Sequence, residues 1–185
     1  GVTLAVTGKG GIRENKVVYR ILDVISNVIR SIPFLILLIL IIPLTRFLVG
    51  KSYGSSATIV PLVIAAAPFI ARMVESSLQE VDEGVVEAAK SMGAGTWTII
   101  FRVLLVEART SLIVGVTIAL GTILGYSAMA GVVGGGGLGD IAIRYGYYRY
   151  QTDIMVVTIV ILVLIVQVLQ ALGMMLSKKL DRRNK

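Results

Sequence analysis

Long apolar stretches separated by short polar segments dominate this sequence. Three of these stretches contain no Asp, Glu, Lys or Arg: residues 52–71, 110–139 and 154–177. A helix of about 20 apolar residues crosses a hydrocarbon core about 30 Å thick, and each stretch reaches that length. The pattern therefore predicts three membrane-spanning helices, placed at residues 54–73, 110–133 and 154–177.

A fourth apolar segment is shorter. Its charge-free part, residues 31–45, covers only about 22 Å at the rise of an α-helix. Arg30 and Arg46 flank it, and long basic side chains can reach the membrane surface from such positions. With its apolar neighbours the segment is long enough to span, and Pro33 lies where a kink is tolerated. We predict a further span over residues 24–49.

The basic residues are divided unevenly between the two ends of these spans. With four spans, fourteen of the 18 Lys and Arg residues fall on the face that carries both termini and the central loop of residues 72–109. Cytoplasmic loops retain Lys and Arg, so this loop and the C-terminus are predicted to be cytoplasmic. We interpret the apolar residues 2–6 as the end of a further N-terminal span, missing here, rather than as the remnant of a cleaved signal peptide.

Composition narrows the possible functions. The chain has no Cys and no His, which excludes disulfides, thiolate nucleophiles and imidazole ligands for metals. Its net charge of +7 comes from Lys and Arg at the ends of apolar segments, without a basic stripe interleaved with aromatic residues. Membrane lipid is therefore the expected partner, and nucleic acid is not. We expect the chain itself to hold no catalytic residue, metal or cofactor.

Two motifs resemble nucleotide sites in the wrong context. The glycines of residues 134–139 satisfy G-x-G-x-x-G, yet they follow a long charge-free stretch where a dinucleotide fold has a short strand. Residues 50–52, Gly-Lys-Ser, resemble the end of a phosphate loop, but Thr45 occupies the leading glycine position and the predicted side is external. Any ATP hydrolysis is therefore expected from another polypeptide.

The sequence argues against transport coupled to protons and leaves coupling to sodium open. Proton relays need ionisable groups inside the membrane, and the apolar cores of the four predicted spans contain none. Sodium coupling through backbone carbonyls at a broken helix stays open, since the glycine run could supply such a break.

The polar residues 72–109 have a helical pattern. Ser77 and Glu80 form an S-x-x-E capping box. The helix that this box would open has one apolar side and ends before Gly93, and a second helix can begin at Thr96. The loop is therefore predicted to hold two short amphipathic helices separated by a glycine turn, lying against the membrane or a partner.

The third predicted span is rich in small residues. Gly121 and Gly125 form G-x-x-x-G, a spacing that lets helices pack closely in lipid, so we expect them to contact another span or a symmetry mate. Tyr126, Ser127 and Met129 place polar and polarisable groups in the same span, with Tyr126 and Met129 on one helix face. They are the candidate substrate pathway; ordinary core packing is the alternative.

The most specific signal lies in the central loop, taken as residues 75–107. The sequence reads Glu-Ala-Ala-Lys-Ser-Met-Gly at residues 87–93 and Arg-Val-Leu-Leu-Val-Glu-Ala at residues 102–108. It resembles the EAA loop of ABC importer permeases, whose short coupling helices sit in a cleft of a cytoplasmic ATPase. The resemblance implies coupling roles for Glu87, Ala88, Ala89, Gly93, Leu104 and Leu105. The family usually has proline where this chain has Val106, which leaves a kink there unsupported. A surface helix without a partner is the alternative.

Further blocks extend the resemblance over nearly the whole chain. They are Arg-Ser-Ile-Pro-Phe at residues 30–34, Ala-Ala-Pro-Phe-Ile-Ala-Arg-Met-Val-Glu at 66–75, Gly-Tyr-Ser-Ala-Met at 125–129 and Gly-Gly-Leu-Gly at 136–139. They look like the permease subunits of bacterial methionine ABC importers. The resemblance implies an all-α integral membrane protein of the type I importer kind. Residues 1–185 would form a single transmembrane permease domain, a polytopic helical bundle with five spans in the family.

The resemblance also implies a function and partners. The chain would be one permease of a homodimer in the bacterial cytoplasmic (inner) membrane, with two ATPase subunits that bind ATP and Mg and an external methionine-binding lipoprotein. It would pass L-methionine, with D-methionine as a second candidate, and perform no catalysis itself. An importer for another amino acid, a cation-coupled secondary transporter and a non-transporting membrane scaffold are the alternatives.

Overall fold

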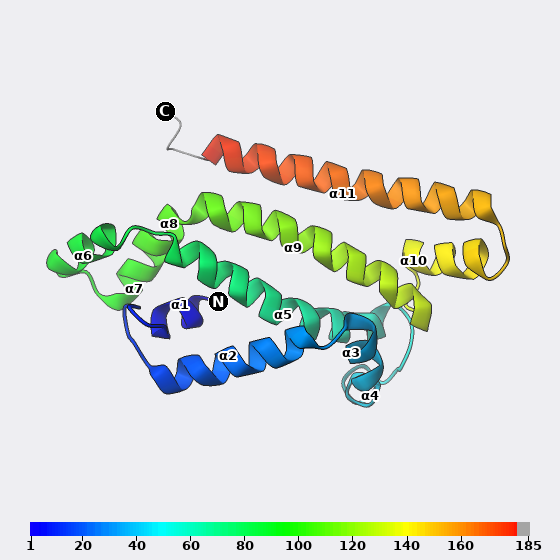
Figure 1. Ribbon diagram of the computed structural model, residues 1–185, viewed down its shortest axis with the longest axis horizontal. Coiled ribbons are helices and arrows are strands. Elements are labelled where there is room, and N and C mark those ends of the chain that lie inside the picture. The colour runs from blue at the N-terminus through cyan, green and yellow to red at the C-terminus, as the bar shows by residue number, and fades with distance from the viewer. Residues whose placement is uncertain (181–185) are drawn as a thin grey trace. The chain divides into compact units, whose positions relative to one another are not determined.

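The computed structural model describes residues 1–180, and every regular element in that range is helical (Figure 1). The α-helices are α1 (Val2–Thr7), α2 (Lys16–Ser31), α3 (Phe34–Leu40), α4 (Ile42–Val49), α5 (Ser55–Gln79), α6 (Glu83–Ser91), α7 (Thr96–Thr98), α8 (Leu105–Glu107), α9 (Arg109–Ala130), α10 (Gly137–Ile141) and α11 (Thr152–Leu180). Two π-helical segments, η1 (Ile99–Leu104) and η3 (Ala142–Tyr147), and a 3₁₀ turn, η2 (Gly131–Val133), complete them.

Three helical segments are long and apolar enough to cross a membrane. They are Ser55–Gln79, Arg109–Val133 and Thr152–Leu180. Each overlaps one of the spans predicted at residues 54–73, 110–133 and 154–177. Most apolar residues of α11 are exposed within the chain, as expected where lipid or another subunit covers a helix.

The segment predicted as a kinked span over residues 24–49 contains parts of three helices, α2, α3 and α4. The α2 helix ends at Ser31, α3 begins after Pro33, and the two axes are bent by 103°. Proline has no N–H to donate and disfavours helical geometry in the residue before it, so a continuous helix cannot pass this point easily. A second break lies at Ile41, one residue before α4, whose first turn contains Pro43. The bend at Pro33 is much sharper than a simple kink, and α2 and α3 together are apolar and long enough for one bent span. The span over residues 24–49 stays a prediction.

Residues 1–180 form two compact units, which we describe separately. Unit 1 contains Gly1–Val28, Pro68–Thr117 and the end of α11 from Gly173, and unit 2 contains Ile29–Ala67 and Ile118–Leu172. The core of unit 1 consists of buried Leu78, Ala89, Ile99, Leu104 and Ala108. The core of unit 2 consists of Phe34, Leu38 and Ala130, with Leu62, Ala65, Tyr126 and Val133 packed against them.

Candidate functional site

The loop between α5 and α9 begins later than the sequence predicted. The α5 helix continues through Ser77 to Gln79, and α6 begins at Glu83. The cap of α6 is Asp82, whose Oδ1 accepts a hydrogen bond of 2.8 Å from the backbone N–H of Gly84. Ser77 is buried in unit 1, where the Ser111 hydroxyl donates a 3.0 Å hydrogen bond to its Oγ. The predicted capping box is therefore wrong, because the carboxylate of Asp82, five residues after Ser77, caps the helix instead.

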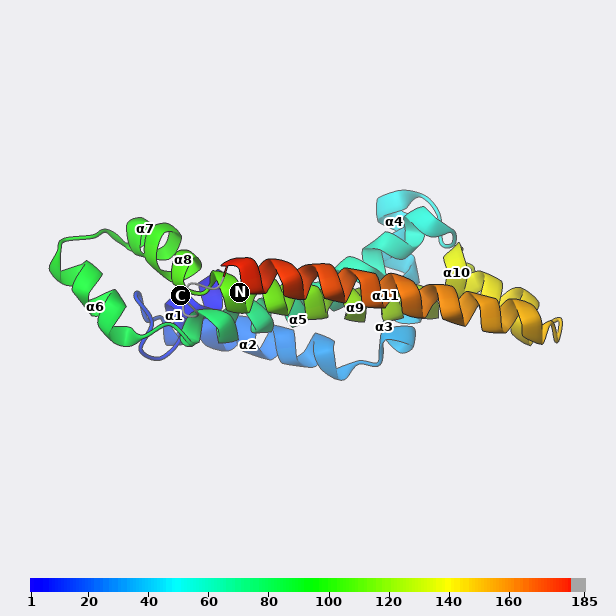
Figure 2. The same ribbon diagram turned by 90° about the horizontal axis from the view of Figure 1, so that it is seen from above.

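The turn after α6 forms as predicted. Gly93 has φ of +79°, the left-handed conformation that glycine adopts without a Cβ penalty. Its N–H donates to the Lys90 carbonyl at 2.9 Å, and the Ala94 N–H donates to the Ala89 carbonyl at 3.0 Å, which together satisfy the last carbonyls of the helix. The chain then re-enters a helix at Thr96, and Figures 1 and 2 show the helical stretch from α7 beside α6.

The residues expected to couple to an ATPase fall into two groups. Glu87, Ala88 and Gly93 are exposed on α6 and its turn. Ala89 and Leu104, at 5% and 7% exposure, lie in the core of unit 1, and the half-buried Leu105 packs against that core. The second group therefore holds the loop together, whereas the first group is free to meet a partner.

Three large apolar side chains beside this turn were not among the site residues expected from the sequence. Met92, Trp97 and Phe101 are 81%, 73% and 59% exposed, and the rings of Trp97 and Phe101 stack with centroids 5.9 Å apart. An aromatic pair four residues apart in a polar loop is the signal that could have found them. Aromatic residues and Met are enriched at protein interfaces, so they extend the exposed surface of α6 with contact area suited to a partner.

The candidate pathway residues do not share one environment. In unit 2 the Tyr126 ring stacks on Phe34 with centroids 4.7 Å apart and planes 9° from parallel. Ser127 is exposed, and Met129 is 48% exposed. Ser127 and Met129 are thus exposed on the surface of the chain, whereas Tyr126 is half-buried.

Gly121 and Gly125, both expected at a helix contact, differ in how close they lie to neighbouring atoms. A Cβ at Gly121 would lie 3.3 Å from Nε2 of Gln170 on α11, so this glycine lies close to another helix. No heavy atom lies within 4 Å of a Cβ built at Gly125. At Gly139, by contrast, a Cβ would overlap the backbone of Ala128. Helix α10 thus packs backbone to backbone against α9, a role for the glycine run that the sequence reasoning did not identify.

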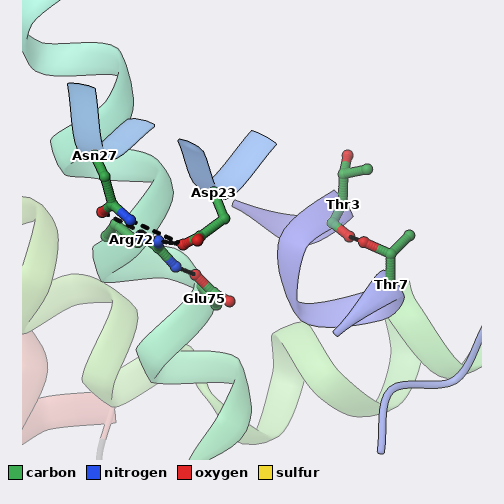
Figure 3. Close-up of polar contacts among 6 residues, drawn as sticks. All are labelled: Thr3, Thr7, Asp23, Asn27, Arg72 and Glu75. Atoms are coloured by element: carbon green, nitrogen blue, oxygen red, sulfur yellow. Dashed lines mark hydrogen bonds and ion pairs between the residues drawn. The ribbon is translucent and has the colours of Figure 1, made fainter. Parts of the chain in front are cut away.

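A charged cluster joins α2 to α5 in unit 1 (Figure 3). Arg72 forms an ion pair with Asp23 and a second with Glu75, the latter at 2.7 Å between Nη1 and Oε2. Its Nη2 also donates to the Asn27 side-chain oxygen at 3.3 Å. The Glu75 side chain is only 5% exposed. The sequence reasoning used Arg72 solely as an orientation signal, since pairing between distant segments has no local pattern.

Comparison with known proteins agrees with this architecture. Residues 1–185 match the family described as binding-protein-dependent transport system inner membrane component. The chain is 52% identical over 183 residues to the probable D-methionine transport system permease protein MetI of Vibrio cholerae, covering 99% of this chain and 81% of that protein. It is 46% identical over 180 residues to the methionine import system permease protein MetP of Bacillus subtilis, covering 97% and 81%.

Solved structures give the same result. A chain of the inward-facing MetNI methionine ABC transporter (CY5 SeMet soak crystal form) superposes with a TM-score of 0.96 at 48% identity, covering 98% of this chain and 84% of that one. A chain of an amino acid ABC transporter crystallised with histidines shares the fold, with a TM-score of 0.76 at 20% identity over 96% and 82% of the two chains. The all-α membrane fold of a type I importer permease, expected from the sequence, is thereby confirmed. The chain belongs to the family of binding-protein-dependent transport system inner membrane components.

Proposed function

We propose that this chain is the transmembrane permease subunit of an ATP-driven importer that passes methionine across the bacterial cytoplasmic membrane. The observation that carries the proposal is the agreement with methionine permeases over the full described fold, at 52% identity and with a TM-score of 0.96. The long apolar helices supply the membrane passage, and the chain itself performs no catalysis.

Coupling to ATP hydrolysis is assigned to the exposed side of α6 and its turn. Glu87 and Ala88 are exposed there, and Met92, Trp97 and Phe101 add an apolar surface next to them. Ala89 of α6 and Leu104 of η1 pack in one buried core. Because such a core is close-packed, we expect a displacement of α6 to move η1 and the start of α9 with it. A separate ATPase, which binds ATP and Mg, is the partner proposed for this surface.

The passage is proposed to form between two copies of the chain in the membrane. Ser127, Met129 and the open position at Gly125 supply a polar, polarisable and glycine-thinned surface for it. Tyr126 is also proposed as a pathway residue. Its ring stacks on Phe34 and would support the surface formed by Ser127 and Met129. No charged group of this surface holds a zwitterion, so the affinity for methionine is assigned to an external binding lipoprotein.

The central loop and the C-terminus are proposed to face the cytoplasm, because they carry most of the Lys and Arg residues. Of the C-terminal basic residues, Lys178 and Lys179 end α11. Arg182, Arg183 and Lys185 lie outside the described residues. Cysteine accessibility to an impermeant reagent would test this orientation, with single cysteines introduced in the loop and in residues 50–53, because residues 1–185 contain no cysteine.

The deciding experiment is uptake of radiolabelled methionine by proteoliposomes that hold the permease, its ATPase and its binding protein. We expect uptake that requires ATP inside and is competed by unlabelled methionine. Stronger competition by another amino acid would favour an importer for that substrate. Uptake that follows a sodium gradient without ATP would instead show a cation-coupled transporter.

A further inference from the structure

A cleft in unit 1 serves none of the roles described above. Its volume is about 330 Å³, a size at the lower end of small-molecule pockets. The lining comes from the end of α5, from α8 and from the first turns of α9: Ser77, Glu80, Val81, Val106, Glu107, Ala108, Arg109, Thr110, Ser111 and Val114. It therefore lies where the coupling loop leaves one candidate span and joins the next.

The charged side chains of this cleft lack partners of their own. Arg109 is half-buried, and neither it nor Glu80 nor Glu107 makes an ion pair or a side-chain hydrogen bond within residues 1–180. A guanidinium has a planar fork of hydrogen-bond donors, which suits a carboxylate. The two glutamates suit an ammonium group. The same cleft thus offers both halves of a zwitterion their opposite charge.

Hydroxyl groups and an apolar wall complete the cleft. Ser111 donates to Ser77 at 3.0 Å, so one of their two hydroxyl protons is used in this bond and the other remains for an acceptor. Ser77 is 4% exposed, which fixes its position. Val81, Val106 and Val114 add apolar surface to the lining.

We propose that this cleft binds a free α-amino acid with an apolar side chain. Its carboxylate would lie at Arg109 and the serine hydroxyls, its ammonium group at Glu80 and Glu107, and its side chain on the valines. The inference rests on the proposed function, under which the cleft opens on the cytoplasmic side where the imported amino acid is released. Anionic lipid is disfavoured because the two glutamates outnumber the single arginine.

The test is photolabelling of the assembled permease and ATPase complex in nanodiscs with a diazirine analogue of methionine. After irradiation, mass spectrometry of the digested permease should place the label within residues 77–81 and 106–114. Unlabelled methionine should compete. Methionine methyl ester, which lacks the carboxylate, and N-acetylmethionine, which lacks the ammonium group, should not.

Variants locate the binding chemistry. Arg109→Gln should lower labelling about tenfold or more, because it removes a charge-assisted hydrogen bond. Glu107→Gln should lower it as well, and this residue is exposed, so its replacement leaves the fold intact. Arg20→Gln is the matched control: Arg20 is an exposed arginine of unit 1 outside the cleft, and labelling should not change.

Three results would overturn the proposal. They are a label confined to other segments, equal labelling of the Arg109 and Arg20 variants, and labelling of the cleft by a diazirine phosphatidylethanolamine but not by the amino acid. Methionine uptake measured with the same complex separates this proposal from the proposed function. Uptake without cleft labelling rejects only the cleft, whereas cleft labelling without uptake rejects only the transport assignment.

Discussion

Loss of the Arg72 side chain should destabilise unit 1 strongly. Its guanidinium holds Glu75 on its own helix and Asp23 on α2. The Glu75 carboxylate is almost fully buried, and its Oε1 already lacks a hydrogen-bond partner within residues 1–180. Arg72→Ala would leave this carboxylate buried without a cation.

The expected loss follows from the burial of the partners. Removing one member of a buried ion pair costs about 3–5 kcal/mol. We expect the lower end, about 3 kcal/mol, since Asp23 is 29% exposed and stays partly hydrated. Arg144→Ala is the matched control, because it breaks the i,i+4 pair with Asp140 while Arg144 is 56% exposed. Because the Arg144 cation is solvated, this pair is expected to contribute at most about 1 kcal/mol, although the Asp140 side chain is only 16% exposed.

The assay is SDS titration of the purified permease in mixed micelles, followed by far-ultraviolet circular dichroism. Arg72→Ala should unfold at clearly lower SDS than Arg144→Ala. Combining Arg72→Met with Glu75→Leu should recover much of the loss, because it removes the carboxylate together with its cation. Equal midpoints for the two single variants would refute the reasoning. A double variant as unstable as Arg72→Ala would show that lost packing, rather than an unpaired charge, is responsible.

Three further predictions concern coupling, packing and the pathway. Glu87→Arg should lower transport-coupled ATP hydrolysis several-fold while the permease still inserts, because this exposed residue faces the proposed ATPase; unchanged hydrolysis would contradict docking there. Gly139→Ala should destabilise the permease by about 1–3 kcal/mol through overpacking. Gly95→Ala should not, because no heavy atom lies within 4 Å of a Cβ built there. The measurement is the fraction of each variant that stays monodisperse on gel filtration after heating. Met129→Ala should alter methionine uptake at constant basal ATPase, whereas Tyr126→Phe keeps its ring stack and should change uptake less; normal uptake in both assigns them to packing.

Elements set by local patterns could be predicted from the sequence. The charge-free stretches indicated α5, α9 and α11 to within a few residues of their ends, except that α5 extends to Gln79. The turn at Gly93 was predictable because a left-handed residue after an amphipathic stretch favours glycine. Pro33 indicated a kink, but neither the 103° bend there nor the second break at Ile41 followed from hydrophobicity, because apolar content says nothing of backbone hydrogen bonds lost at proline.

The coupling residues show where local reasoning stops. Ala88 and Ala89 are chemically identical neighbours, yet one is exposed and the other lies in the core of unit 1. Which of them faces inward depends on η1 packing against α6, a contact between separate segments. The ion pairs of Arg72 could not be predicted from the sequence for the same reason, since Asp23 lies 49 positions away along the chain.

The break at Pro33 bears on how the protein is made. Helices α3 and α4 have seven and eight residues, so each covers only about 10–12 Å and neither can enter the membrane alone as a span. Phe34 packs with Ala130, which emerges from the ribosome 96 residues later. At about 5–20 residues per second, this partner is synthesised roughly 5–20 s after Phe34. Leu62 and Ala65 of α5 reach this core first, so we expect the nascent segment to keep part of its apolar surface uncovered by the protein until α9 is made.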